Sequence, residues 1–353
     1  MSADPPPRPG GADALRLRGL SVAYGPVQAL SDVHLQVAAG EVLALLGPSG
    51  SGKSTLLHTV AGFHPPQAGE VWVLGRRVAS PASSEPPERR DLAMVFQNYA
   101  LWPHLSALDT VAYPARRRGE TRVQARSQAL IILDRLNIAH LADRYPAELS
   151  GGEQQRVGLA RALARQAAVY LFDEPTAHLD THVRAVFLAE LLLRQRDAGA
   201  AALYATHDAE EALGLANRVA LMAAGRLVQV GTPEEVYSRP VDEWAARLTG
   251  PASVLTLGGG ADRVLVRPEW ASLGGDRSAQ VREVWFRGPH SDYLLDSAEG
   301  RLLVREPGPP GCRPGDRVTW SLRRTWSFRK PDGPREPDDQ ARPQVPSSVA
   351  GPE

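Results

Sequence analysis

The most constraining feature of this 353-residue sequence is a glycine-rich loop between an apolar strand and an apolar helix. Residues 41–46 read EVLALL, and residues 47–55 read GPSGSGKST before the apolar segment LLHTVAG. The loop fits the pattern G-x-x-x-x-G-K-[ST] in the strand–loop–helix context that this pattern requires. Its backbone N–H groups can surround phosphate oxygens, Lys53 can neutralise the β and γ oxygens, and Ser54 can offer a hydroxyl to Mg²⁺. We expect these residues to bind a nucleotide: Gly47, Pro48, Ser49, Gly50, Ser51, Gly52, Lys53, Ser54 and Thr55.

Four near-continuous apolar runs predict a mainly parallel sheet. They lie at residues 41–46, 91–96, 167–172 and 201–206. Such strands are buried on both faces, which implies an α/β fold with helices covering the sheet. Between residues 97 and 145 the strand pattern disappears, and residues 122–145 are amphipathic and helical instead. We therefore expect a helical subdomain at about residues 97–150, inserted into an α/β domain that spans residues 14–246.

The pattern changes again after residue 240, where short alternating segments are separated by Gly, Pro and Asp. The segments are residues 263–267, 280–287, 292–296, 301–305 and 317–322. Short strands in succession predict a small all-β barrel of the oligonucleotide/oligosaccharide-binding type at residues 251–329, with a boundary near residue 250. The polar, proline-containing ends, residues 1–13 and 330–353, are expected to be disordered tails.

Polar side chains stand at the ends of these apolar strands. Asp173 and Glu174 follow residues 167–172, Gln97 follows residues 91–96, and His207 follows residues 201–206. In open α/β sheets ligands collect at the carboxyl edge, so these side chains would surround one γ-phosphate. We expect Asp173, with Ser54 and Gln97, to act on Mg²⁺. We also expect Glu174 to polarise the attacking water, with Gln97 and His207 in the same catalytic group.

The segment LSGGEQQR, residues 149–156, predicts a second phosphate site. Ser150 and Glu153 form an S-x-x-E capping box at the start of a helix. Glycine is a poor helix former, so Gly151 and Gly152 are costly here. They leave backbone N–H groups bare at the positive end of the helix, where an anion can approach closely.

Five motifs follow one another within residues 14–246: the P-loop, a Q-loop at Gln97, LSGGEQQR, LFDEPTAHLD and an isolated histidine. These motifs, in this order, resemble those of the nucleotide-binding subunit of ATP-binding cassette (ABC) transporters. The resemblance implies that Tyr24, in LSVAYG, stacks on adenine and that Asp180 belongs to the nucleotide site. The family usually has serine at the position of Ala177, which puts the communication between two sites in doubt.

The family pairs two subunits head to tail. The resemblance therefore implies that Ser150, Gly151 and Gly152 hold the γ-phosphate of the partner's ATP. The partner is a second copy or a paired ATPase subunit. The glycines fit this role because a backbone must approach the nucleotide across an interface.

Residues 266–270, VRPEW, and 314–322, PGDRVTWSL, resemble the TOBE extension of ATPases from bacterial binding-protein-dependent importers. This resemblance implies ATP and Mg²⁺ as ligands, and two transmembrane permease subunits and a solute-binding protein as partners. It also implies a peripheral position on the cytoplasmic face of the inner membrane, with no nucleic acid bound. Residues 96–114 resemble the Q-loop region of the same group. There Leu101 and Trp102 either line a groove for a permease helix or pack in the core.

Composition bears on the alternatives. Forty basic residues balance forty acidic ones, so no overall charge indicates a nucleic-acid binder. No apolar run approaches the roughly 18 to 20 residues of a membrane span, and the start of the chain lacks the apolar core of a signal peptide.

The alternative is a soluble cassette ATPase of DNA repair or translation, which usually has paired cassettes, coiled coils or basic surfaces. A small-molecule P-loop kinase would lack LSGGEQQR. His178 and His182 could form a metal pair, but the family motif already explains their segment.

Overall fold

The computed structural model describes residues 13–96, 100–176, 184–189, 192–193, 199–257 and 262–328. Several positions from the sequence analysis lie outside these residues: Gln97, Ala177, His178, Asp180 and His182. The expected tails also lie outside them, apart from Asp13, which begins the first strand. The chain divides into two units, Met1–Val230 and Gly231–Glu353.

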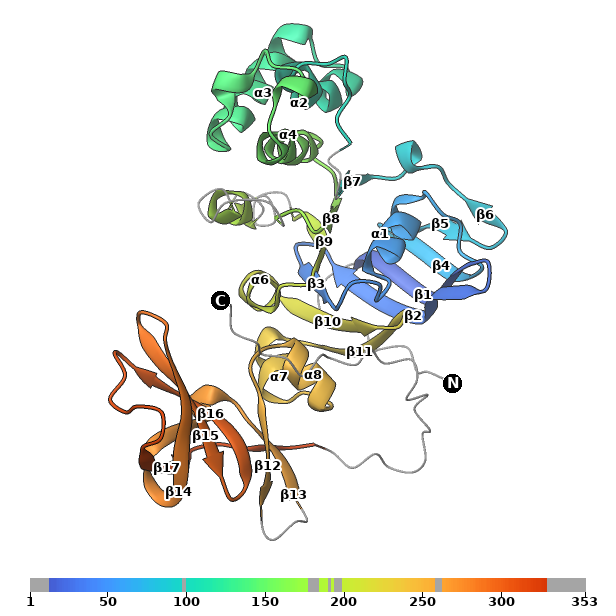
Figure 1. The fold of residues 1–353 in the computed structure, drawn as a ribbon. Coiled ribbons are helices and arrows are strands. Elements are labelled where there is room, and N and C mark those ends of the chain that lie inside the picture. The colour runs from blue at the N-terminus through green and yellow to red at the C-terminus, as the bar shows by residue number, and fades with distance from the viewer. Residues whose placement is uncertain are drawn as a thin grey trace. The chain divides into compact units, whose positions relative to one another are not determined.

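A six-stranded sheet forms the centre of the first unit. Its strand order is β11-β10-β3-β9-β8-β7, and the pairs from β10 to β7 are all parallel. Every residue of β3, β8 and β9 is buried, as their apolar sequences require. The mainly parallel sheet expected from the sequence is therefore confirmed (Figure 1). The strands are β3 (Val42–Leu46), β7 (Leu92–Val95), β8 (Val169–Asp173), β9 (Ala201–Thr206), β10 (Arg218–Ala223) and β11 (Arg226–Gly231).

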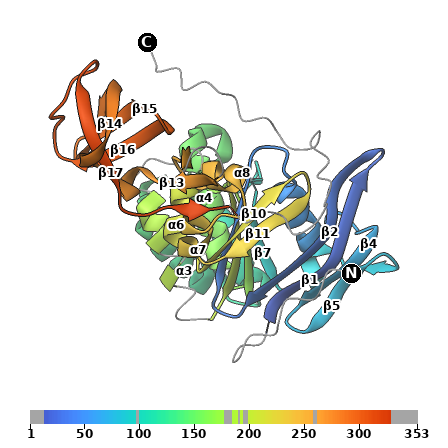
Figure 2. The ribbon, with the colours of Figure 1, turned by 90° about the horizontal axis from the view of Figure 1, so that it is seen from below.

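The first unit also contains a five-stranded antiparallel sheet, which the sequence analysis did not predict. Its order is β2-β1-β4-β5-β6, and β1, β2, β4 and β5 are seen together in Figure 2. Register shifts interrupt the pairing of β1 with β2, so the strict apolar alternation that marks a strand is broken. The helix α1 (Lys53–Ala61) shares one apolar core with both sheets. The strands are β1 (Asp13–Tyr24), β2 (Val27–Ala38), β4 (Ala68–Val73), β5 (Arg76–Ser80) and β6 (Ser83–Ser84).

Three helices, α2 (Ala107–Arg117), α3 (Arg122–Arg135) and α4 (Gly151–Ala164), pack together, drawn in green in Figure 1. Each is preceded by a hydroxyl residue whose side chain caps the helix by accepting a backbone N–H of the first turn. The helix expected over residues 122–145 is wrong in length. It ends at Arg135, and Asn137 then takes a left-handed φ of 57°. The shorter elements of this unit are η1 (Pro87–Arg89), η2 (Ala139–Leu141), η3 (Pro146–Glu148) and α6 (Ala209–Leu215).

The second unit begins with two short helices, α7 (Pro233–Ser238) and α8 (Glu243–Leu248), and continues as an all-β part. A three-stranded sheet has the order β12-β13-β18, and a four-stranded sheet has the order β16-β15-β14-β17. The strands β12 and β18 were not predicted from the sequence. The elements are β12 (Ser253–Leu257), β13 (Asp262–Val266), η4 (Pro268–Trp270), β14 (Ala271–Phe286), β15 (His290–Ser297), β16 (Gly300–Pro307), β17 (Arg317–Leu322) and β18 (Trp326–Ser327).

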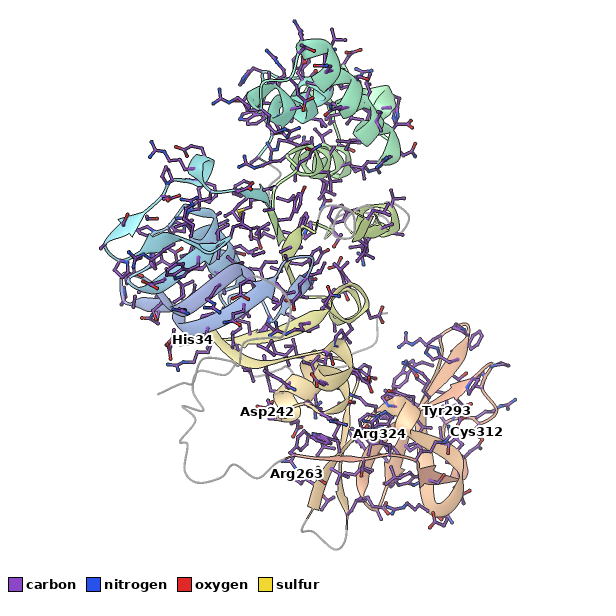
Figure 3. The ribbon with its side chains drawn as sticks, turned by 180° about the vertical axis from the view of Figure 1, so that it is seen from behind. His34, Asp242, Arg263, Tyr293, Cys312 and Arg324 are labelled. Carbon is purple, nitrogen blue, oxygen red and sulfur yellow. The ribbon has the colours of Figure 1, made fainter. Side chains whose placement is uncertain are left out.

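Both sheets of the second unit contribute to one apolar core, with Trp320 and Tyr293 among its largest fully buried side chains. Figure 3 labels Tyr293, whose hydroxyl accepts the backbone N–H of Gly311 at 2.8 Å. Arg324 lies over the ring of Trp270, 4.5 Å from its centroid. None of the helices in the described residues is both long and apolar enough to cross a bilayer.

Candidate active site

The loop between β3 and α1 holds a buried lysine. Lys53 is 5% exposed, and its Nζ donates to the carbonyl oxygens of Gly47 at 2.7 Å and Pro48 at 3.1 Å. The same Nζ lies 3.9 Å from Oε1 of Glu174. Burial lowers the pKa of Lys53, while the negative charges of Glu174 and Asp173 oppose that shift. The loop thus holds a buried cation whose hydrogen-bond acceptors are neutral carbonyl oxygens, which the charged oxygens of an anion could replace.

The glycines of this loop have different reasons to be glycine. A Cβ on Gly47 would lie 2.3 Å from the carbonyl oxygen of Met222, so no side chain fits there. Gly50 has a φ of +78°, and a Cβ on it would meet none of the described atoms within 4 Å. Beside it, Ser51 is buried, and its Oγ has no hydrogen-bond partner among the described residues. An open backbone next to a hydroxyl without a partner leaves donors available for an anion such as a phosphate group.

A hydroxyl and a carboxylate meet beside the lysine. Ser54 lies in the first turn of α1, and Asp173 is the last residue of β8. Ser54 Oγ donates to Oδ1 of Asp173 at 2.9 Å. Burial raises the pKa of Asp173, and the hydrogen bond from Ser54 opposes that shift. Oxygen ligands of this kind suit Mg²⁺, which takes one or two protein carboxylates and completes its shell with phosphates and water. In the described part of the chain, no group of three or more His, Cys, Asp and Glu side chains could hold a metal by itself.

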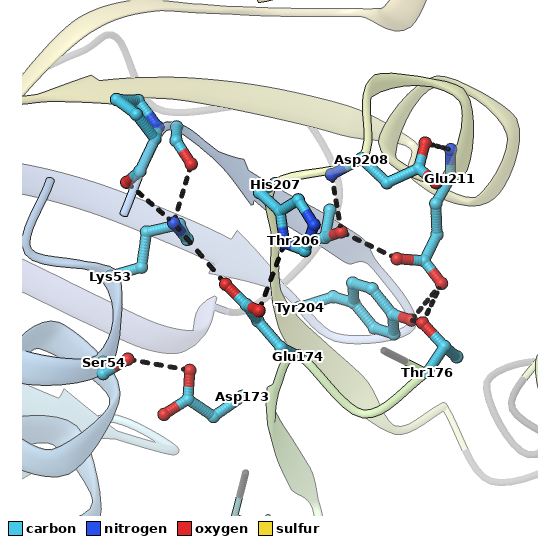
Figure 4. A network of polar contacts seen from close by, with 12 residues as sticks. Lys53, Ser54, Asp173, Glu174, Thr176, Tyr204, Thr206, His207, Asp208 and Glu211 are labelled. Atoms are coloured by element: carbon cyan, nitrogen blue, oxygen red, sulfur yellow. Dashed lines mark hydrogen bonds and ion pairs between the residues drawn. The ribbon is translucent and has the colours of Figure 1, made fainter. Parts of the chain in front are cut away.

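Glu174 lies between Lys53 and His207 (Figure 4). Its Oε2 is 3.1 Å from Nδ1 of His207, and its backbone N–H donates to the carbonyl oxygen of Ala205 at 3.0 Å. The backbone φ of Glu174 is +48°, a left-handed conformation that is uncommon for residues other than glycine. Such a conformation persists only where the surroundings fix it, and it is typical of functional sites.

Tyr24 ends β1 and is 45% exposed. Its ring and that of His64 are nearly perpendicular, with 5.4 Å between the centroids and an angle of 85° between the planes. His64 in turn lies 5.9 Å from His58 of α1, so the exposed ring is supported by neighbours from two segments. An exposed aromatic face of this kind can stack on a flat base.

The start of α4 lies among the packed helices, apart from α1, which shares its core with the two sheets (Figure 1). Ser150 caps the helix. Its backbone N–H donates to Oε2 of Glu153 at 2.7 Å, and its hydroxyl accepts the N–H of Glu153 at 3.4 Å. Ser150 and Gly151 are exposed, and a Cβ on Gly151 would meet none of the described atoms within 4 Å. The helix start is therefore open to a ligand, but it does not belong to the cluster around Lys53.

The structure brings together five of the expected site residues at one edge of the parallel sheet: Lys53, Ser54, Asp173, Glu174 and His207. It places Tyr24 at the end of β1, and Ser150, Gly151 and Gly152 at the start of α4. Gln97 and Asp180 lie outside the described residues. Next to Glu174 and His207 lies a set of buried polar residues that was not predicted from the sequence. Hydrogen bonds join its members, Thr176, Tyr204, Thr206 and Glu211. The D-x-x-E spacing of Asp208 and Glu211 signals a helix start, but nothing in the sequence signals their burial.

Comparison with known proteins finds relatives that match most of the chain. The family model described as ABC transporter matches residues 30–177, and the TOBE domain model matches residues 264–327. The first match begins in β2 and ends just after Glu174, so it includes the phosphate loop and the start of α4.

Two curated relatives match most of the chain. The sn-glycerol-3-phosphate import ATP-binding protein UgpC of Cupriavidus necator is 40% identical over 301 residues, which are 85% of this chain and 78% of that protein. The trehalose/maltose import ATP-binding protein MalK of Thermococcus litoralis is 37% identical over 306 residues, or 83% and 82% of the two chains. A solved dimeric ATP-binding cassette in a post-hydrolysis state, bound to ADP and Pi, matches with a TM-score of 0.57 and 29% identity. That match covers 62% of this chain and 98% of the other.

Proposed function

Because this chain belongs to the ABC transporter family, as an ATP-binding subunit of an importer, we propose that the cluster around Lys53 hydrolyses ATP. One observation carries the proposal. The Glu174 carboxylate is held between Lys53 Nζ and His207 Nδ1, beside a loop with an unused buried hydroxyl on Ser51. The sequence alternative, a cassette ATPase of DNA repair or translation, finds no support, since both relatives named above are import subunits.

The phosphate loop would bind the β- and γ-phosphates of ATP. Lys53 would exchange the carbonyl oxygens of Gly47 and Pro48 for phosphate oxygens, which are stronger acceptors because they are charged. Ser51 Oγ and the loop N–H groups would donate to the same phosphates. The exposed ring of Tyr24 would stack on the base.

Ser54 and Asp173 would hold Mg²⁺, and we propose Gln97 as a further ligand from outside the described residues. The oxygen donors of the first two residues fit a hard cation. Held there, Mg²⁺ would supply positive charge that offsets the negative charge of the phosphates.

Glu174 would orient and polarise the attacking water as a general base. Its Oε2 is already engaged by His207, which fixes the carboxylate in one direction. His207 remains more than half exposed, so it can still reach a γ-phosphate beside it. The two residues would act together, because the hydrogen bond between them sets the direction of both.

We further propose that two copies, or this subunit and a paired one, enclose ATP head to tail. Ser150, Gly151 and Gly152 would contact the ATP held by the partner's loop, with Asp180 beside the same nucleotide. The exposed start of α4 supports this, because its N–H groups are open to an anion while Lys53 lies at the start of another helix, α1. The solved relative described above is dimeric and was captured after hydrolysis.

The pair would act beneath two transmembrane permease subunits on the cytoplasmic face of the membrane, with a solute-binding protein supplying the solute. Residues 96–114 are the proposed permease contact. Trp102 packs against Tyr113 of α2 at 4.8 Å and under Arg161 of α4 at 5.0 Å, so it helps to fix this segment on the helices. Leu101, which is half-buried, is the better candidate for the contact itself. The relatives serve different solutes at similar identity, so solute choice would lie in the other subunits.

The substitution Glu174→Gln tests the catalytic assignment. It keeps the size of the side chain and removes the carboxylate, so the turnover number should fall about 10²- to 10⁴-fold. The affinity for ATP, measured by titration with Mg²⁺ present, should stay close to that of the wild type. Glu210→Gln, on the exposed side of α6, serves as the matched control and should hydrolyse ATP normally. Equal turnover in the two variants would remove Glu174 from the proposed role.

A further inference from the structure

A buried carboxylate is hydrogen-bonded to the segments that carry Glu174 and His207. Glu211 of α6 is 8% exposed and accepts hydrogen bonds from three hydroxyl groups. Tyr204 donates to Oε1 at 2.7 Å, Thr206 donates to Oε2 at 2.7 Å, and Thr176 donates to Oε1. Figure 4 shows these three donors around the Glu211 carboxylate, and all three are themselves buried.

The local sequence explains how Glu211 reaches this position. The strand β9 ends at Thr206, and Asp208 caps α6 by accepting the backbone N–H of Glu211 at 3.2 Å. Thr206 Oγ1 also accepts the backbone N–H of Asp208 at 3.0 Å, which fixes the turn between strand and helix. Burial raises the pKa of Tyr204 well above its ordinary value, and Glu211 adds to this shift. Tyr204 therefore keeps the proton that it donates.

The donors come from the two segments that carry the proposed catalytic side chains. Thr206 immediately precedes His207, and Thr176 follows Glu174 by two residues. The segment with Glu174 and Thr176 needs the hydrogen bond to Glu211, because Glu174 has a left-handed φ of +48°. It receives one further contact from α4, where Nε2 of Gln155 donates to the carbonyl oxygen of Pro175.

Burying a carboxylate is costly, and a well-packed apolar residue could fill the same volume. A purely structural role would not require one acceptor to join these two segments. We propose that Glu211 is a positioning residue for ATP hydrolysis. By binding Thr176 and Thr206 at once, it sets the separation and the direction of Glu174 and His207. This inference rests on the roles proposed above for those two side chains.

The variant Glu211→Gln tests it. The amide oxygen can still accept from Thr176 and Tyr204, but the amide N–H₂ then faces Thr206, whose hydroxyl can no longer donate there. The turnover number should fall about 10- to 100-fold, because a displacement of about 1 Å at a reacting group costs that much. The KM for ATP should change less than threefold, since the phosphate loop is untouched. Glu210→Gln makes the same charge change on the same turn and should match the wild type.

A second pair of variants keeps the proposal testable if Glu211→Gln folds poorly. Thr206→Val removes the hydroxyl while keeping the branched shape, and should reduce turnover as Glu211→Gln does. Thr206→Ser restores a hydroxyl and should recover turnover to within about threefold of the wild type. Equal turnover in the valine and serine variants would overturn the proposal.

A double-mutant cycle separates positioning from general stability. In the His207→Ala background, Glu211→Gln should reduce the residual phosphate release by less than threefold. The variant loses only the bond from Thr206, the neighbour of His207, and His207 is already absent, while the bond from Thr176 in the Glu174 segment is kept. A loss as large as in the wild-type background would contradict the inference. Normal turnover of both Glu174→Gln and His207→Ala would instead refute the proposed function. If those two variants are impaired while Glu211→Gln behaves as Glu210→Gln does, only this inference fails.

Discussion

Lys53 has one set of partners in the structure and would have a second in the proposed complex with ATP. Its ammonium group is buried, and the carbonyl oxygens of Gly47 and Pro48 accept from it in the structure. Glu174 and Asp173 supply negative charge nearby, yet burial still lowers the pKa of the lysine. A phosphate with charged oxygens would stabilise this cation more than two neutral carbonyls do. The lysine is therefore already held near the place where a phosphate would bind.

Lys53→Ala should weaken ATP binding about 10- to 100-fold, because a hydrogen bond to a charged group contributes about 1.5–3 kcal/mol. Titration with a fluorescent ATP analogue measures this directly. Arg226→Ala removes an exposed cation from β11 of the same unit and should bind the analogue as the wild type does. An unchanged affinity in Lys53→Ala would mean that the lysine does not contact the phosphates.

At the scale of elements, two buried arginines hold helix ends. Arg90 donates to the carbonyl oxygens of Thr59 and Val60 at the end of α1, and burial lowers the pKa of Arg90 to about 10. In the second unit, Arg267 is fully buried and bonds carbonyls at the ends of α7 and α8. The last carbonyl groups of a helix have no hydrogen-bond donor within the helix. Each guanidinium group donates to several carbonyl oxygens at once and so supplies the missing donors.

Arg267→Met should destabilise the second unit by about 3 kcal/mol or more, because it leaves several buried carbonyl groups without a donor. Hydrogen exchange of the amides in α7, α8 and β13 measures this locally. Arg263→Met, on β13 just before Arg267, is the control. Its exposed ion pair with Glu243, at 2.6 Å, contributes at most about 1 kcal/mol. If both variants exchange equally fast, Arg267 does not hold the helix ends.

The contrast between these elements shows what the sequence could predict. Four strands of the parallel sheet, β3, β7, β8 and β9, were predictable because each is a continuous apolar run, and polar residues mark their ends. The strands β10 and β11 were not predicted, and β11 is only partly buried. The antiparallel sheet was not, because register shifts in β1 break its alternation. The contacts of Arg267 and Glu211 were also beyond prediction. Each joins residues from separate elements, such as Thr176 and Glu211, and no local pattern encodes such contacts.

At the scale of the whole molecule, the proposed nucleotide site is divided within one chain. Lys53, Asp173 and Glu174 lie at the edge of the parallel sheet, whereas Ser150 and Gly151 lie at the start of α4 among the helices. Motif order predicted both sets of residues, but only a second subunit would bring them to one nucleotide. The site proposed here is therefore complete only in a pair.

This division predicts how two substitutions combine. Glu174→Gln should bind ATP without hydrolysing it, so a closed dimer should accumulate, visible by size exclusion with light scattering in ATP and Mg²⁺. Ser150→Arg places a bulky cation at the start of α4 and should prevent closure while ATP still binds to the phosphate loop. The chain with both changes should remain monomeric.

Thr121→Arg in the Glu174→Gln chain is the matched control for this experiment. Thr121 caps α3 with the same kind of capping box that Ser150 forms on α4, so both substitutions lose a cap worth about 1 kcal/mol. Because α3 has no proposed contact with the partner's nucleotide, the control chain should still dimerise with ATP. If the chain carrying Ser150→Arg dimerises as well as this control does, the start of α4 does not bind the partner's phosphate, and the two glycines there need another explanation.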